Sequence, residues 1–158
     1  MQSFKDSTGR AWNLSIDVGA VKRIRDLLKV DLMDAISDSG RLLMKLDGDP
    51  CLLVDIIYVL CKPEADAANI TDEDFGRAMI GDVIDSATAA FLEELANFFP
   101  GRRRTLLKKA VSKVNQAQNM AADRAEKALD EMDLEKVLDN VTNLALTGGT
   151  SSLNAQES

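Results

Sequence analysis

The sequence contains no histidine. Histidine is the commonest general base and the commonest metal ligand in proteins, so serine–histidine and cysteine–histidine nucleophile pairs are excluded within this chain. The glycine patterns of phosphate and dinucleotide sites and the Cys-x-x-Cys motif are also missing. We therefore expect a protein that is not an enzyme, with no catalytic residue, no cofactor and no metal site.

Cysteine is scarce, and long apolar runs are absent. Cys51 and Cys61 are the two cysteines. On one helix they would lie about 15 Å apart, which excludes a disulfide between them, and we interpret both as small apolar core residues. No apolar run reaches the roughly 20 residues that cross a bilayer, and Met1–Asp6 lacks the apolar region of a signal peptide. These absences predict a cytoplasmic protein without a membrane partner.

Charge is distributed unevenly along the 158 residues. Residues 1–99 carry 10 Lys/Arg and 18 Asp/Glu, a net charge of −8, whereas residues 100–158 carry 9 and 8, a net charge of +1. The two parts together give the net charge of −7. An acidic body repels nucleic acid, so we do not expect nucleic acid as the partner.

The most apolar stretch runs from Cys51 to Cys61 and is interrupted only by Asp55. Before it, Asp49 can accept hydrogen bonds from the first helical turn, and Pro50 suits the first helical position. Lys62-Pro63 is predicted to end the helix, followed by a loop. A helix that is apolar on nearly all sides must be surrounded by other helices. We interpret the stretch as a central helix; a strand is the alternative, because Val, Ile and Tyr favour strands.

Periodicity predicts a mainly α fold around this helix. Residues 3–16 alternate as in a hairpin, with the turn at Asp6–Gly9, and Asp17 can cap the helix that follows. The segment Thr71–Asp74 resembles a capping box, and its helix should bury Phe75, Met79 and, at its edge, Ile80. Further helices are expected at about 32–36, 40–46 and 82–98.

The C-terminal part lacks glycine and proline from Arg102 to Thr147. Its apolar stripe is thin and rich in alanine, which favours a helix but buries little area. One helix, or two with a break near Asp130–Asp133 and a cap at Asp133, fits the pattern. The expected organisation is a hairpin and helical core over 1–100, a helical segment over 101–146 and a disordered tail over 147–158.

Two acidic features are candidates for chemistry. The first is a group of carboxylates that capping can explain and that lacks the spacing of a calcium loop: Asp72, Glu73, Asp74, Asp82 and Asp85. The second is Asp55, whose burial without a partner would be costly. We expect it either to face the one wet side of the central helix or to pair with a basic residue such as Arg23, Arg25 or Arg77.

A basic segment begins the C-terminal part, with six positive charges between Arg102 and Lys113 and no acid among them. It is either a docking patch for phosphate or an acidic partner, or a solvated helix start that pairs with the acidic body. Positive charge at a helix N-terminus is locally unfavourable, which favours docking. The candidate partner-binding residues are Arg102, Arg103, Arg104, Lys108, Lys109, Val111 and Val114.

The order of three stretches resembles the tail assembly chaperones of long-tailed, siphovirus-type bacteriophages. None of the three is a catalytic signature, and together they cover roughly residues 3–110. They are Phe4–Trp12 running into Asp17–Arg23, Asp49–Asp55 running to Leu60–Pro63, and Thr71–Arg77 with Gly81-Asp82 and Phe98–Pro100 after it.

The resemblance implies a helical protein that keeps the tape-measure protein soluble while the tail tube assembles around it. It also implies a second contact with the tail tube protein, a place in the host cytoplasm, absence from the finished virion, and a longer form made by ribosomal frameshifting. Self-association is expected, because a chaperone that coats a long client gains avidity from repeated contacts. The alternative is a small helical regulatory adaptor that docks an acidic partner or nucleic acid through Arg102–Lys113.

Overall fold

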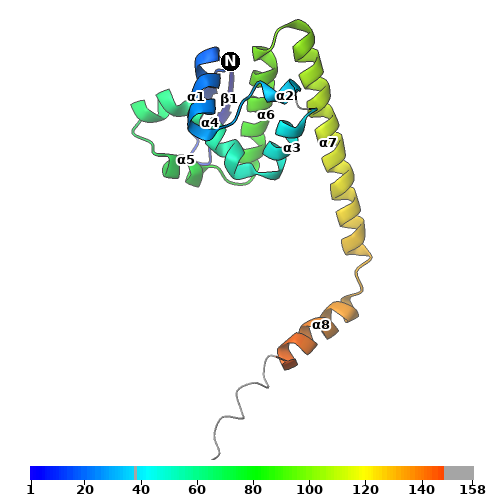
Figure 1. The fold of residues 1–158 in the computed structure, drawn as a ribbon. Coiled ribbons are helices and arrows are strands. Elements are labelled where there is room, and N and C mark those ends of the chain that lie inside the picture. Colours follow the sequence, from blue (N-terminus) through cyan, green and yellow to red (C-terminus); the bar gives the residue numbers. More distant parts are fainter. Residues whose placement is uncertain (38, 148–158) are drawn as a thin grey trace, which may run out of the picture. The chain divides into compact units, whose positions relative to one another are not determined.

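The computed structural model describes residues 1–37 and 39–147. In this part of the chain the fold is mainly α, as predicted, with one antiparallel hairpin (Figure 1). The strands are β1 (Gln2–Lys5) and β2 (Ala11–Leu14). The helices are α1 (Val18–Leu28), α2 (Asp34–Ser37), α3 (Arg41–Gly48), α4 (Pro50–Ala67), α5 (Asp72–Ala78), α6 (Asp82–Phe98), α7 (Gly101–Asp130) and α8 (Leu134–Thr147).

The chain divides into two compact units: an N-terminal unit, Met1–Gln116, and a C-terminal unit that begins at Ala117. The first part of α7 therefore belongs to the N-terminal unit and the rest of α7 to the C-terminal unit. No helix in the described ranges is both long enough and apolar enough to cross a bilayer.

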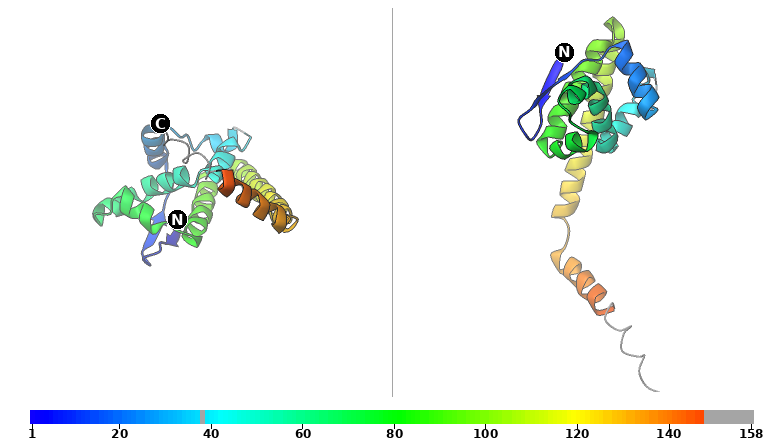
Figure 2. Two further views of the ribbon diagram at one scale, coloured as in Figure 1. Left: turned by 90° about the horizontal axis from the view of Figure 1, so that it is seen from below. Right: turned by 90° about the vertical axis from the view of Figure 1, so that its left-hand side faces the viewer.

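The hairpin forms where the alternation predicts it, with Phe4 opposite Trp12 and Gln2 opposite Leu14. Gly9 takes a φ of +86° in the turn, a conformation that glycine adopts without steric cost. The side chains of Phe4, Trp12 and Leu14 are buried, because β1 packs against α6 and β2 against α4 and α6. Figure 2 shows the two strands at one side of the helices of this unit.

Helix α4 is the centre of the N-terminal unit. It packs against α1, α3, α5, α6 and β2, and its buried side chains include Leu53, Ile56 and Ile57. Asp49 caps it as predicted: its Oδ1 accepts from the Leu52 amide at 3.0 Å. The prediction of a central helix is confirmed, and the strand alternative is wrong.

The predicted end of this helix at Lys62-Pro63 is wrong, because α4 continues through Pro63 to Ala67. Proline removes one backbone donor, but the extra turn gives other contacts in return. Ala65 is fully buried and its carbonyl accepts from Ile70 at 2.8 Å, and Lys62 Nζ lies 2.9 Å from Asp66 Oδ1. Pro63 itself is exposed, so its ring meets solvent rather than a packed neighbour.

Two expected core residues are exposed. Ile80 is 59% exposed, since it lies between α5 and α6, where Gly81 turns the chain with a φ of +55°. Cys51 is exposed, because it lies in the first turn of α4, next to Pro50 and ahead of the buried part of the helix. Cys61 is buried as expected, and burial, with a smaller contribution from Glu64, raises the pKa of its thiol to about 12.

Helix α7 joins the core through its first turns only. Leu107 is fully buried, and Ala110, Val111 and Val114 pack against the core. Beyond Val114, every residue of α7 is exposed. The N-terminal unit therefore packs the start of the predicted apolar stripe against its own core.

The C-terminal unit has two helical segments separated at Glu131–Asp133. Asp133 Oδ1 accepts from the Glu135 amide at 3.1 Å, so the expectation of a break with a cap at Asp133 is confirmed. Thr147 is the last residue of α8. The rest of the expected disordered tail, 148–158, lies outside the described residues.

Candidate partner-binding surfaces

Two cations of the basic segment hold α7 against α6. Arg104 donates from Nε to the Phe99 carbonyl at 3.2 Å and from a terminal nitrogen to the Asn97 carbonyl at 3.3 Å. These carbonyls belong to the last turn and C-cap of α6, where a helix leaves acceptors unsatisfied. Lys108 Nζ lies 3.4 Å from Glu93 Oε1 on α6. For these two side chains, pairing within the N-terminal unit explains their presence.

The other four cations of the segment are exposed: Arg102, Arg103, Lys109 and Lys113. None has an acidic partner among residues 1–37 and 39–147. Arg102, Lys109 and Lys113 share one helix face with Leu106, because the four follow at steps of four, three and four residues. We call Arg102, Leu106, Lys109 and Lys113 the α7 basic face.

The predicted partner-binding residues thus lie on different sides of α7. Arg102 and Lys109 belong to the α7 basic face, while Val111 and Val114 are half-buried and pack against the core. Arg104 is hydrogen-bonded to the end of α6. The structure brings together the cations of the α7 basic face, and it places Val111 and Val114 on another side of the helix, against the core.

Arg104→Ala is expected to lower the free energy of unfolding by about 1 kcal/mol, because the last carbonyls of α6 lose a charged donor. Urea unfolding followed by circular dichroism measures the change. Arg103→Ala is the matched control and should leave stability within about 0.5 kcal/mol. Equal losses in the two variants would show that Arg104 does not cap α6.

Helix α8 carries a second candidate surface. None of its residues is among the partner-binding residues predicted from the sequence. None of its residues is buried. Large apolar side chains follow at steps of three and four and form the α8 stripe, defined as Leu134, Val137, Leu138, Val141 and Leu144. The stripe is well exposed, with Leu138 at 61% and Leu144 at 73%. Its signal in the sequence is the recurrence of leucine and valine at helical spacing from Leu134 to Leu144.

The carboxylates of α8 lie away from the stripe. Glu135 and Asp139 lie four residues apart and so share one side of α8. Between Asp130 and Thr147 there are five Asp or Glu residues and one lysine, Lys136, which gives a net charge of −4. The described part of the C-terminal unit therefore carries an exposed apolar face and, on the other side of α8, two carboxylates.

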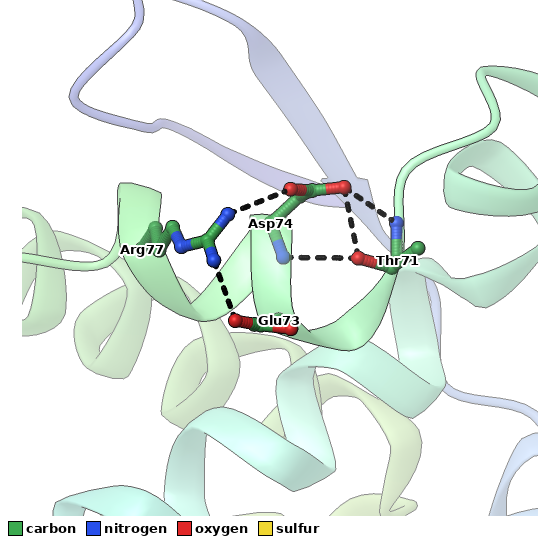
Figure 3. Close-up of polar contacts among 4 residues, drawn as sticks. All are labelled: Thr71, Glu73, Asp74 and Arg77. Carbon is green, nitrogen blue, oxygen red and sulfur yellow. Dashed lines mark hydrogen bonds and ion pairs between the residues drawn. The ribbon is translucent and has the colours of Figure 1, made fainter.

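The acidic group at α5 serves the helix itself. Thr71 Oγ1 donates to Asp74 Oδ2 at 2.8 Å, and the Asp74 amide donates to Thr71 Oγ1 at 3.1 Å (Figure 3). Hydrogen bonds from the Thr71 side chain and backbone lower the pKa of Asp74. Glu73 and Asp74 both pair with Arg77, and the described part of the chain holds no cluster of three residues suited to a metal ion. The capping box accounts for Asp74, and the ion pair with Arg77 accounts for Glu73.

Asp55 does not have the expected basic partner among the described residues. Arg25 pairs with Asp31 at 2.6 Å, and Arg77 pairs within α5. Asp55 is half-buried, which agrees with the alternative that it faces a partly wet side of α4. Burial raises the pKa of this carboxyl, and repulsion from Asp72 and Asp49 raises it further.

Comparison with protein-family models, with curated proteins and with solved structures gives no match for this chain.

Proposed function

We propose that the protein is a tail assembly chaperone that binds the tape-measure protein and keeps it soluble during assembly of a phage tail tube. The observation that carries this proposal is the α8 stripe, an apolar face on a helix that buries none of its residues. The resemblance of the three sequence stretches supplies the identity of the client. Self-association and contact with the tail tube protein belong to the same proposal.

A helix of this length depends on a partner. Isolated helices shorter than about 12–15 residues are marginal in water, and most helical stability in proteins comes from packing an amphipathic face. Helix α8 has 14 residues and exposes its apolar face. A chaperone for a long helical client needs such an apolar surface outside its own core, and it needs no catalytic site.

Co-expression with the tape-measure protein of the same genome tests the proposal. The client should become soluble and co-elute with several copies of this protein in size-exclusion light scattering. A chain truncated after Met132 lacks α8 and should leave the client insoluble. A client that stays insoluble with the full-length chain contradicts the proposal.

The same truncation is expected to leave the thermal unfolding midpoint of the N-terminal unit unchanged within about 1 °C. The reason is that α8 buries no side chain, and surface changes of this kind have little effect on stability. Calorimetry of both chains measures the midpoints. A drop of about 5 °C, which corresponds to roughly 1 kcal/mol for a small domain, would show that α8 contributes to the core.

The α7 basic face favours a second candidate function, an adaptor for an acidic partner. Its three cations have no acidic partner within the described residues, and exposed cations contribute attraction that salt screens. Binding to DNA or to an acidic protein that disappears at high salt, and that Lys109→Glu abolishes, would support the adaptor. Salt-tolerant retention of the long helical client would support the chaperone.

A further inference from the structure

Two helix faces of opposite charge in this chain have the same spacing. The first is the α7 basic face, whose four residues follow at steps of four, three and four. The second lies on the side of α8 away from the α8 stripe, and its residues follow at the same steps. Residues at such steps share one side of a helix. We call this second set the α8 acidic face, defined as Glu135, Asp139, Thr142 and Leu146.

Both faces are without a partner in the part of the chain that the structure describes. All of their residues are exposed, and no ion pair among the described residues involves a charge of either face. Each face also exposes one leucine, Leu106 at 47% on α7 and Leu146 at 67% on α8. The two surfaces are therefore complementary in charge and similar in apolar content.

The equal spacing allows the charges to pair in one register. With the two helices side by side and antiparallel, Lys113 lies opposite Glu135, and Lys109 lies opposite Asp139. The two lysines and the two carboxylates are each four residues apart, a rise of about 6 Å, so both pairs form together. In the parallel register Leu106 would lie opposite Asp139, and only one pair of opposite charges would form. The spacing therefore favours the antiparallel contact.

We propose that the α7 basic face of one copy of this protein binds the α8 acidic face of a second copy. The inference rests on the self-association that the proposed function includes, and it names the two surfaces that make it. In the antiparallel register Leu106 lies opposite Thr142, one turn from Leu146, so apolar contact accompanies the ion pairs. Each copy carries both faces, so the contact is head-to-tail and can continue from copy to copy. The α8 stripe stays free for the client.

The α8 acidic face of the same chain is too close in sequence to make this contact. Helix α7 is continuous from Gly101 to Asp130, so Lys113 lies about 25 Å back along α7 from its last residue. Glu135 follows that residue by five positions, which span at most about 18 Å when fully extended. The register that pairs Lys113 with Glu135 therefore needs the α7 of another copy.

Sedimentation velocity of the full-length chain at low salt tests the contact. The weight-average mass should rise with protein concentration, and high salt should return it toward the monomer, because salt screens exposed ion pairs. The double change of Lys109→Glu and Lys113→Glu, the α7 variant, should weaken self-association at least about tenfold. The double change of Glu135→Lys and Asp139→Lys, the α8 variant, should do the same. In each variant two attractive pairs become repulsive.

Exchange of the charges identifies the two partner faces. A chain with all four substitutions again has opposite charges across the contact, and it should self-associate as the wild type does. An equimolar mixture of the α7 variant and the α8 variant should associate although neither does so alone, because each supplies the face that the other lacks. Lysine and glutamate are both good helix formers, so both helices should persist, which circular dichroism checks.

A control variant separates the α7 basic face from general charge. The double change of Lys22→Glu and Arg23→Glu alters net charge as the α7 variant does, and both positions are exposed on α1. This control should leave self-association within about twofold of the wild type.

Four results would overturn the inference. The first is a wild-type chain that stays monomeric at low salt. The second is equal weakening in the α7 variant and the α1 control. The third is self-association that both double variants retain and that Leu138→Asp abolishes, since the α8 stripe would then hold the copies. The fourth is an α7 variant that self-associates normally but no longer holds the client, since the client would then occupy the α7 basic face.

The proposed function can fail separately. If copies associate through the two faces but the tape-measure protein stays insoluble, the inference holds and the chaperone function does not. If the wild type solubilises the client and does not self-associate, the chaperone function holds and the assignment of the two faces is wrong.

Discussion

Replacing Trp12 with alanine is expected to lower the free energy of unfolding by about 4 kcal/mol, the usual range for a fully buried large aromatic side chain. Trp12 is 1% exposed. Its ring centroid lies 5.0 Å from that of Phe75 in an edge-on arrangement, and its indole nitrogen donates to Asp6 Oδ2 at 2.8 Å. One side chain thus joins the hairpin to α5 and to its own turn.

Urea unfolding followed by circular dichroism measures this loss, because the variant has no tryptophan fluorescence. A domain is stable by only about 5–15 kcal/mol, so the midpoint should move to much lower urea. Trp12→Phe keeps most of the ring volume but loses the indole donor, and it should cost less than Trp12→Ala. Met44→Ala, at a position 57% exposed, is the surface control. A Trp12→Ala loss below about 1 kcal/mol would place Trp12 outside the core.

Local signals in the sequence predict much of this fold. Asp17 accepts from the Ala20 amide at 2.7 Å, and Thr71 and Asp74 form their capping box, because a cap involves residues within three positions of one another. The hairpin turn and the break at Asp133 are local in the same sense. Such features depend on a few neighbouring residues, so sequence spacing is enough to place them.

The errors arise where distant contacts override a local signal. Pro63 is a local stop signal, but α4 continues because Ala65 is buried against other elements and Glu64 accepts from the Asn13 side chain at 3.0 Å. Cys51 is apolar in a run of apolar residues, yet the first turn of α4 lies outside the packed region. Neither outcome can be derived from spacing along one helix.

On the candidate surfaces, too, the sequence predicts the local features but not those that depend on distant contacts. The sequence locates the positive charges between Arg102 and Lys113, but it does not separate those that bind within the N-terminal unit from those that have no acidic partner in the described part of the chain. Arg104 donates to backbone carbonyls at the end of α6. Every residue has a backbone carbonyl, so the sequence does not show which ones an arginine will bind. The exposure of the α8 stripe also depends on what packs against it, which a helical period alone does not reveal.

Asp6 is the second position at which one substitution should have a large effect. The side chain is buried, and its Oδ1 accepts from the Thr8 amide at 2.9 Å, the Thr8 hydroxyl at 2.6 Å and the Arg10 amide at 3.1 Å. Oδ2 accepts from the Trp12 indole. Asp6→Ala leaves these donors without a partner and should lower the free energy of unfolding by about 3 kcal/mol. Asp6→Asn keeps one acceptor oxygen and should lose less.

The pH dependence of these variants tests whether Asp6 is charged in the fold. Burial raises the pKa of this carboxyl, but hydrogen bonds from Thr8, Trp12 and Arg10 together outweigh burial, so the pKa lies below its ordinary value. A lowered pKa contributes stability that is fully present above the unfolded value of about 3.9 and is lost as pH falls through the folded value. The stability difference between wild type and Asp6→Asn should therefore be constant from pH 7 to about pH 5 and shrink below about pH 4.

Asp55→Asn provides the control of opposite sign. Because the pKa of Asp55 is raised in the fold, ionisation of the wild-type carboxyl destabilises the protein as pH rises through that value. Asp55→Asn should therefore be more stable than the wild type at pH 7, and this advantage should disappear in acid. Chemical denaturation at a series of pH values measures both variants against the wild type.

If the Asp6→Asn difference stayed constant down to about pH 2, the hydrogen bonds in the hairpin turn would be made to a neutral carboxyl, and charge would contribute nothing to this turn.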